Sequence, residues 1–246
     1  MIIRFTTDAL VINHSSIGDN DLLLTLMTRD LGVIRAFAVG AKSIKSKRAS
    51  ASAVLSFSNF QLDKKGDTYK VIEATANKVF FGAGSDVLTL SVAQYFCELC
   101  AYLGPRDESA DEFLRTVLNS LYFMTDKGKN PLLIKAITEL RLLVLSGYAP
   151  GLVACDGCGK FDEDIMYFKV DNGMIYCKDC KKDGCIPLNR TVLDAMRHIV
   201  FSKLNNLYSF DIPDKDIKTL EKITEKYTVF QTENRFSTLN FIHSVL

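Results

Sequence analysis

The sequence predicts an α+β protein with more than one domain, in which an antiparallel five-stranded barrel precedes an all-α domain with a small metal-binding insertion. Three observations lead to this fold class. Apolar and polar residues alternate over residues 1–80, helical periodicity takes over from residue 85, and two Cys-x-x-Cys pairs interrupt the helices. A chain of 246 residues is long enough for more than one core. We therefore expect domains at residues 1–80 and 81–246, with the insertion at 153–186.

The first 80 residues predict five short strands separated by turns. One strand lies in ALVINHSS, and two lie in DLLLTLMTRDLGVIRAFAVGA on either side of residues 30–32. A hairpin lies in AVLSFSNFQLDKKGDTYKVIEATA, with residues 65–67 at its tip. No segment between these strands is long enough for a crossover helix. The number and spacing of the strands indicate a small barrel of the OB type.

Amphipathic helices are predicted after residue 85, because apolar residues recur at spacings of three and four. Ser109 and Glu112 form a capping-box pattern for a second helix. Asn130 and Pro131 are typical of the start of a third helix, and Gly147 of its end. The predicted apolar faces are Leu88, Val92, Tyr95, Phe96, Leu99, Tyr102 and Leu103; Phe113, Val117 and Leu121; Val192, Ala195, Met196 and Ile199; and Ile217, Leu220, Ile223 and Tyr227.

The N-terminal segment and the cysteine count favour a cytosolic protein. Polar residues interrupt MIIRFTTDALVIN, so we expect no signal peptide, and no stretch approaches the roughly 18 apolar residues of a membrane span. Seven cysteines, an odd number, argue against a disulfide framework and for reduced thiols. The net charge of +1 does not by itself indicate a nucleic-acid binder, so the distribution of charge is more informative than its sum.

Four cysteines have the paired spacing of a zinc ribbon: Cys155, Cys158, Cys177 and Cys180. The intervening MYFKVDNGMIY predicts a hairpin with its turn at residues 172–173, which would bring the two pairs together. Four thiolates leave a zinc ion no open coordination position, so we expect one structural Zn²⁺ and no metal-centred catalysis. A redox dithiol, a metal-free loop and an iron site are the alternatives to zinc.

The other three cysteines are not expected to bind metal. Cys97 and Cys100 also form a Cys-x-x-Cys pair, but they lie inside a helical pattern, where cysteines usually act as small buried apolar residues. Cys185 follows the second pair by five residues and could substitute as a ligand, but the regular quartet makes it surplus.

A basic segment, GAKSIKSKRAS at residues 40–50, makes the barrel a candidate DNA-binding domain. It contains four cations and no acidic residue, and small side chains surround the charges. We expect aromatic residues of the barrel to provide stacking surfaces, or else to fill its core: Phe37, Phe57, Phe60 and Tyr69. The alternative is a solvated loop with no ligand. The predicted DNA-binding residues are Arg35, Lys42, Lys45, Lys47, Arg48, Lys64 and Lys65.

No motif in the sequence favours an enzyme. GAKS lacks the Gly-Lys-Ser/Thr of a phosphate-binding loop, and the three histidines His14, His198 and His243 are scattered. A metal-dependent nuclease would need a carboxylate cluster, for which DEDI at residues 162–165 is the nearest candidate. That segment lies in the expected ribbon, where a solvated turn is the simpler explanation. We expect no enzymatic activity and no small-molecule substrate.

Two longer segments resemble a known family. VGAKSIKSKRAS followed by LSFSNFQLDKKGDTYKVIEA is similar to the N-terminal domain of the RecO family, recombination mediators of bacterial DNA repair. LRLLVLSGYAPGLVACDGCGK, in which a helix ends at glycine before the first cysteine pair, is similar to the C-terminal part of that family. The resemblance covers nearly the whole chain.

The resemblance implies a DNA-binding OB fold that contacts single- and double-stranded DNA. It implies annealing of complementary strands and, with the partner RecR, loading of RecA onto DNA coated by single-stranded-DNA-binding protein. The acidic, aromatic-ended tail of that coating protein would bind the helical domain, and the protein would be cytoplasmic, with the nucleoid. Lys42, Lys45, Lys47 and Arg48 match the basic loop of the family, and the four cysteines match its zinc ligands. Lys42 stands where the family commonly has arginine, so bidentate phosphate contacts are not expected there.

A different class of function is also compatible with these patterns. The chain would then be a protein-interaction adaptor whose ribbon and helical domain bind partner proteins, and the basic segment would have no role. The DNA-binding class predicts strand annealing without partners, with an affinity that depends steeply on salt.

Overall fold

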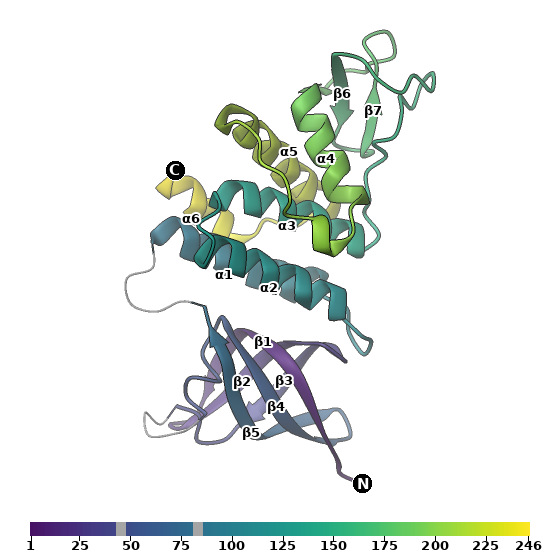
Figure 1. The fold of residues 1–246 in the computed structure, drawn as a ribbon. Helices are drawn as coiled ribbons and strands as arrows, with labels where there is room; N and C mark the ends of the chain where they lie inside the picture. Colours follow the sequence, from purple (N-terminus) through teal and green to yellow (C-terminus); the bar gives the residue numbers. More distant parts are fainter. Residues whose placement is uncertain (43–47, 81–85) are drawn as a thin grey trace. The chain divides into compact units, whose positions relative to one another are not determined.

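The computed structural model describes residues 1–42, 48–80 and 86–246 (Figure 1). Lys45 and Lys47 of the predicted DNA-binding set lie outside the described residues. The chain forms two compact units, residues 1–128 with 238–246, and residues 129–237. In the described part of the chain, no helix has the length and hydrophobicity needed to cross a membrane.

The first unit contains a closed barrel of five strands in the order β1-β2-β3-β5-β4. All neighbouring strands are antiparallel except β3 and β5, which pair in parallel over only two residues of each strand. This confirms the predicted five-stranded barrel, including the hairpin tip at residues 66–67. The strands are β1 (Ile3–Ile17), β2 (Asp21–Thr28), β3 (Gly32–Ala38), β4 (Ser56–Lys65) and β5 (Thr68–Val79).

The period-two pattern forms the barrel because alternate side chains point inward. In β3, for example, Ile34, Ala36 and Ala38 are buried, whereas Arg35 and Phe37 between them are exposed. The interior is filled by apolar side chains from all five strands, so it is a packed core. Two of the aromatic residues considered for stacking, Phe60 and Tyr69, are buried in this core.

Three helices complete the first unit: α1 (Val87–Leu103), α2 (Asp111–Thr125) and α6 (Ser237–Val245), of which residue 237 is assigned to the second unit. Asp86 caps α1 by accepting a hydrogen bond from the N–H of Thr89 at 3.1 Å. The short helix α6 was not predicted. It is held at its start by Glu98, whose carboxylate accepts bonds from the N–H and hydroxyl of Thr238 at 3.1 and 2.7 Å.

The predicted capping box at Ser109 and Glu112 is wrong. Helix α2 begins at Asp111 after Ala110, which has no side-chain cap. The segment before α2 is instead bonded to the turn between β2 and β3, because the carbonyl of Arg29 accepts bonds from the Ala110 N–H at 2.8 Å and the Ser109 hydroxyl at 3.3 Å. Tyr102 also departs from the predicted apolar face of α1, since its side chain is 52% exposed.

The second unit is built on three α-helices and one 3₁₀ turn: α3 (Pro131–Leu145), α4 (Arg190–Phe201), η1 (Leu204–Asn206) and α5 (Asp214–Thr232). The predicted start of α3 is confirmed, because the Asn130 side chain accepts a bond from the Leu132 N–H at 2.9 Å. Gly147 follows the end of α3 with a φ of +87°, as a helix-terminating glycine does. The predicted apolar faces of α4 and α5 are buried.

A buried ion cluster joins α3 to α5. The ammonium group of Lys135 is fully buried and lies 2.9 Å from Glu139, 2.8 Å from Glu221 and 2.8 Å from Glu225. Glu139 also accepts a hydrogen bond from the Thr224 hydroxyl at 2.6 Å. Burial raises the pKa of Glu139, although the nearby lysine opposes this shift. Charges so far from water are retained because each has a partner.

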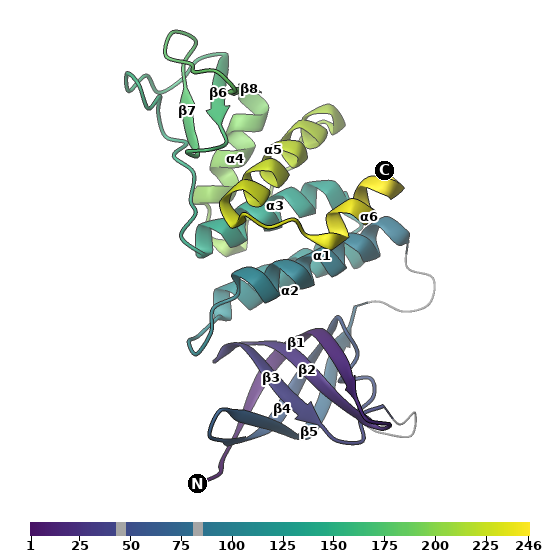
Figure 2. The ribbon, with the colours of Figure 1, turned by 180° about the vertical axis from the view of Figure 1, so that it is seen from behind.

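A three-stranded sheet lies between α3 and α4 in the chain, where the sequence predicted a hairpin (Figure 2). Its strands are β6 (Ile165–Lys169), β7 (Met174–Tyr176) and β8 (Ile186–Asn189), in the order β7-β6-β8. The predicted hairpin at residues 172–173 is confirmed by the pairing of β6 and β7. Strand β8 was not predicted. It leads directly into α4, whose N-cap is Asn189.

The two compact units divide the chain at Gly128, whereas the predicted domains divide it at residue 80. Helices α1 and α2 contact β1 and β2, which places them in the same unit as the barrel. The division at residue 80 marks the change from strands to helices, and it stays a prediction for the domains of the chain.

Candidate functional site

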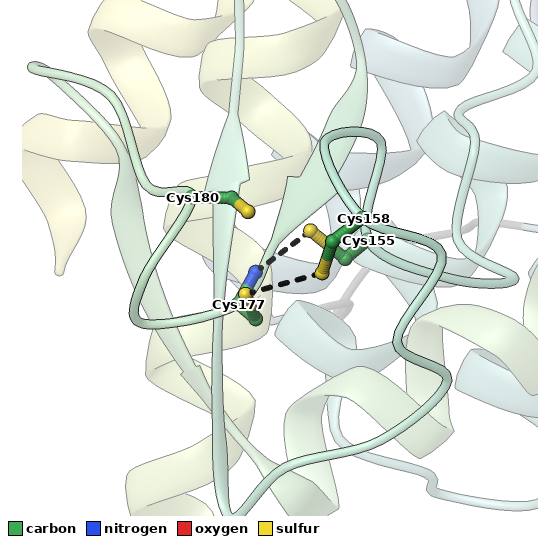
Figure 3. Close-up of side chains that lie close together, drawn as sticks. All are labelled: Cys155, Cys158, Cys177 and Cys180. Carbon is green, nitrogen blue, oxygen red and sulfur yellow. Dashed lines mark hydrogen bonds between the residues drawn. The ribbon is translucent and has the colours of Figure 1, made fainter.

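The four predicted metal ligands lie together at one end of the β6–β7 hairpin. The sulfur atoms of Cys155, Cys158, Cys177 and Cys180 all lie within 4.8 Å of one another. They face a common centre, with Cys158 and Cys177 Sγ 3.7 Å apart (Figure 3). A tetrahedral ion with metal–sulfur bonds of about 2.3 Å would place its ligands about 3.8 Å apart. The spacing of the thiols therefore fits a tetrahedral Cys₄ centre.

The first cysteine pair sits in a tight turn that is closed by backbone hydrogen bonds. The Cys155 N–H donates to the Lys160 carbonyl at 2.8 Å, and the Gly159 N–H donates to the Cys155 carbonyl at 2.8 Å. A Cβ atom at Gly157 would lie 2.8 Å from Cβ and 3.0 Å from Sγ of Cys180. Only glycine at this position lets the first turn approach the second pair.

The hairpin brings the second pair to the first. At its turn, Gly173 has a φ of +68°, and a Cβ atom there would lie 2.6 Å from the Tyr227 hydroxyl. Tyr176 then connects the two halves of the ribbon, because its hydroxyl donates to Asp156 at 2.8 Å and accepts from Asn172 at 2.8 Å. The Cys177 N–H also donates to Cys155 Sγ at 3.2 Å, which links the two pairs directly.

The thiols differ in their tendency to ionise. Burial raises the pKa of Cys155, but hydrogen bonds from the N–H of Cys177 and from its own Cys-x-x-Cys turn outweigh this and lower the pKa to about 6. The neighbouring sulfur atoms of Cys177 and Cys158 raise the pKa of Cys180 to about 12. Four thiolates at this separation repel one another, and a divalent cation at the centre would relieve the repulsion.

A second group of metal-ligating side chains shares one residue with the quartet and has a simpler explanation. Glu163, Cys177 and Asp179 also lie within 4.8 Å of one another. Glu163 is an ion-pair partner of Lys160 and accepts a hydrogen bond from the Lys178 N–H at 3.0 Å. In the DEDI segment, Asp162 pairs with Arg190 and Arg197. These carboxylates therefore have cationic partners within the protein.

Arg197 of α4 attaches the ribbon to the helices, and sequence reasoning missed it. Its guanidinium donates to the carbonyls of Leu152 at 2.8 Å, Val153 at 3.1 Å and Phe161 at 3.0 Å. It also lies over the Phe161 ring, 4.8 Å from the centroid. No local pattern marks this residue, because its partners lie 36 to 45 positions earlier in the chain.

Two of the remaining cysteines are buried, as predicted. Cys97 and Cys100 are buried in α1, and burial raises the pKa of Cys97 to about 12, as expected of an inert thiol. Cys185 is not part of the metal-ligand cluster found among the described residues.

The described cations of the basic segment bond to backbone carbonyls. The Lys42 ammonium group donates to the Gly18 carbonyl at 2.8 Å, and the Arg48 guanidinium donates to the Val39 carbonyl at 3.2 Å. The segment between them, with Lys45 and Lys47, is not described.

The other predicted cations lie on β3 and β4. Arg35 is exposed on the outer face of β3. Lys64 and Lys65 end β4 beside the hairpin tip, where the Lys64 ammonium group lies 5.1 Å from the centroid of the Tyr69 ring. A hydrogen bond from Lys64 to the Tyr69 hydroxyl raises the pKa of Lys64, so this lysine stays charged.

Strand pairing assembles one row of side chains across the outside of the barrel. Phe37 pairs with Lys70, Lys70 with Asp63, and Asp63 with Arg4. Phe37 is 40% exposed, and it is the most exposed of the four aromatic residues considered for stacking. Arg4 and Asp63 form a two-point ion pair at 2.7 and 2.9 Å. We call Arg35, which lies two residues before Phe37 on the same face of β3, together with Phe37, Lys70, Asp63 and Arg4, the barrel row.

Comparison with protein families covers both parts of the chain. Residues 1–80 match the family described as Recombination protein O N terminal, and residues 84–239 match Recombination protein O C terminal. The chain belongs to the RecO family. The family boundary near residue 80 coincides with the change from strands to helices.

Curated relatives of this RecO chain match over nearly its full length. DNA repair protein RecO of Acetivibrio thermocellus is 29% identical over 241 residues, which cover 97% of this chain and 96% of the relative. DNA repair protein RecO of Caldicellulosiruptor bescii is 25% identical, with 97% of this chain and 98% of the relative covered. DNA repair protein RecO of Clostridium novyi is 24% identical, with 91% and 87% covered.

Proposed function

We propose that this chain is a DNA-binding recombination mediator in DNA repair and that its OB-type barrel is the DNA-binding domain. The observation that carries the proposal is the barrel row, in which an exposed aromatic ring lies beside cations on the outside of β3 and β5. OB folds bind oligonucleotides on the face of strands 2 and 3 and on the adjoining loops. The lysines at the tip of the β4–β5 hairpin extend this face.

The chemistry of the row suits a single strand without sequence preference. The Phe37 ring offers a stacking surface to any base, and Arg35 and Lys70 offer positive charge to the backbone. Asp63 is the one acidic member, and its negative charge is offset because Arg4 donates two hydrogen bonds to it and lowers its pKa. Lys42, Lys45, Lys47, Arg48, Lys64 and Lys65 would contribute phosphate contacts around this face.

We further propose that the protein anneals complementary strands and acts with RecR to load RecA onto DNA coated by single-stranded-DNA-binding protein. Membership of the RecO family and the names of the relatives support this role. Contacts to the backbone leave base edges free to pair, which annealing requires. The tail of the coating protein would bind the helical domain, no catalytic activity would be involved, and the protein would act in the cytoplasm with the nucleoid.

We propose that the Cys₄ centre binds one structural Zn²⁺. The ligands would be Cys155, Cys158, Cys177 and Cys180, and the ion would neutralise crowded thiolates and fix the ribbon. The ribbon is not proposed to contact DNA. Residues 153–186 contain seven acidic residues and five lysines, so the insertion is acidic even before the thiolates are counted.

That acidic insertion favours a second function, in which the ribbon and helices serve as a protein-binding adaptor. Annealing of two complementary labelled oligonucleotides by the protein alone separates the two functions. The mediator function predicts annealing faster than the spontaneous reaction and suppressed by added salt. An annealing rate equal to that of the DNA alone, together with no anisotropy change of a labelled single strand, would favour the adaptor function over the mediator function.

A further inference from the structure

The barrel has an open seam between β3 and β5. The two strands pair only at Ala36 with Tyr69 and at Phe37 with Lys70, whereas β5 continues for nine more residues to Val79. Among the described residues, only β4 pairs with this continuation. Every second residue of a strand directs its N–H and C=O groups toward one edge, so the seam side of β5 presents backbone donors and acceptors.

A groove of about 850 Å³ runs along this edge. Its lining on one side is residues 73–76 of β5, and on the other side it is Val39, Arg48 and Ser50. Consecutive side chains of a strand point to opposite faces, so a groove that touches four consecutive residues borders the edge of the backbone. The groove therefore follows the open edge of β5.

The accessible edge is limited in length by two irregularities. The register between β4 and β5 shifts at Ile72 and at Asn77, each of which is an extra residue on β5. Between these bulges, residues 73–76 pair regularly with residues 58–61 of β4. Bulges twist a strand and interrupt its pairing, so a regular stretch of four residues, about 14 Å long, is left. The side chains of Ala74 and Ala76 are small and allow a neighbouring backbone to approach.

We propose that this groove binds an extended peptide segment of a partner protein, which adds a strand to β5 beside residues 73–76. Unpaired backbone groups recognise another backbone, whatever its sequence. Among the lining residues that the structure describes, Arg48 is the cation and Glu73 the anion, so a peptide that carries charges of both signs would be complementary to these two side chains.

The test uses phage-displayed random heptapeptides, selected on the full-length chain, with the most enriched peptide synthesised and labelled. We expect Ala76→Lys to weaken binding of this peptide at least about tenfold, because the new side chain enters the groove. Asn77→Lys adds the same charge at the neighbouring bulge residue, outside the groove lining, and should change affinity less than about twofold. Ser50→Lys, an exposed position on the opposite wall, should reproduce the loss if Ala76→Lys fails to fold, as judged by circular dichroism.

Methylation of the peptide nitrogens, one at a time, tests strand addition directly. Loss of affinity at alternate positions is expected, together with slower hydrogen exchange over residues 71–79 in the complex. The proposal is overturned if no peptide is enriched, if N-methylation has no alternating effect on affinity, or if Ala76→Lys and Asn77→Lys bind the peptide with the same affinity. Displacement of the peptide by a single-stranded oligonucleotide would assign the groove to DNA instead. A change of oligomeric state in Ala76→Lys would assign it to a second copy of the chain. The peptide assay contains no DNA, so its outcome does not depend on the proposed DNA-binding function.

Discussion

Phe37 of β3 and Lys70 of β5 are direct neighbours across the parallel pair that closes the barrel, and both side chains are exposed. An aromatic face beside an ammonium group is an arrangement that binds a nucleotide by stacking on its base and by attracting its phosphate. The two residues are 33 positions apart in the sequence, so only closure of the barrel brings them together.

Phe37→Ala should weaken binding of a single-stranded oligonucleotide by about 1–3 kcal/mol, at least about fivefold in Kd, because one stacking surface is lost. Fluorescence anisotropy at fixed salt measures the effect. Phe201→Ala, an equally drastic change at an exposed ring on α4, is the matched control and should bind as the wild type does. Equal losses in the two variants would remove Phe37 from the interface.

The basic segment should contribute mainly to the salt dependence of DNA binding. In a variant with Lys45, Lys47 and Arg48 all changed to alanine, the slope of log K against log salt should be shallower by about two to three units, because each phosphate contact contributes about 0.7–0.9. The control replaces Lys215, Lys218 and Lys222, which are exposed on α5, and removes the same charge. Parallel slopes for the wild type and the first variant would show that the segment is a solvated loop.

Native mass spectrometry should find about one zinc ion per chain. Cys158→Ser should lose the ion and unfold residues 153–186, since four ligands hold the site together, while hydrogen exchange of the barrel stays unchanged. Cys185→Ser, a thiol outside the quartet, should retain the metal. A metal-free chain whose ribbon is nonetheless protected from exchange contradicts the zinc assignment, and reversible disulfide formation in that chain would favour a redox dithiol.

Arg197→Ala should loosen the ribbon. The change removes three hydrogen bonds from a charged donor, each worth about 1.5–3 kcal/mol, so we expect a loss of at least about 2 kcal/mol in urea unfolding and faster exchange over residues 151–163. Arg197→Lys should not restore stability, because a lysine cannot reach three carbonyls with a planar fork. Arg190→Ala removes ion pairs of a side chain that is 58% exposed and serves as the control, with less than about 1 kcal/mol expected. Similar losses of stability in Arg197→Ala and Arg190→Ala would show that the Arg197 hydrogen bonds do not hold the ribbon on the helices.

Lys135→Met should destabilise the second unit by about 3–5 kcal/mol at neutral pH, because it leaves buried carboxylates without their cation. Burial already raises the pKa of Glu139 in the folded state. A raised carboxyl pKa contributes stability that is present below the unfolded value and lost as pH rises through the folded value. The deficit of the variant should therefore shrink as pH falls from 7.5 toward about 4.5. Urea unfolding across this range measures it, with Lys218→Met as the exposed control. A deficit that does not depend on pH would mean that lost packing, not uncompensated charge, is the cause.

Features encoded by neighbouring residues were predictable from the sequence. Alternation of apolar residues indicated the five strands, apolar residues at spacings of three and four indicated α1, α2, α4 and α5, and Asn130 and Gly147 located α3. The spacing of the cysteines indicated the quartet, and the sulfur atoms do converge. The capping box at Ser109 failed because the segment before α2 bonds to the β2–β3 turn, and a tertiary contact of this kind overrides a local preference.

The sequence by itself therefore determined the five barrel strands, the β6–β7 hairpin, helices α1 to α5 and the residues that form the Cys₄ cluster, because periodicity and spacing act within a few residues; it did not reveal β8 or α6. Only the tertiary structure decided which residues meet across the fold. Closure of the barrel placed Phe37 beside Lys70 and left an open edge on β5, and packing of α4 on the ribbon directed Arg197 to three carbonyls. Strand register and helix packing relate residues tens of positions apart, and no local pattern in the chain records those distances.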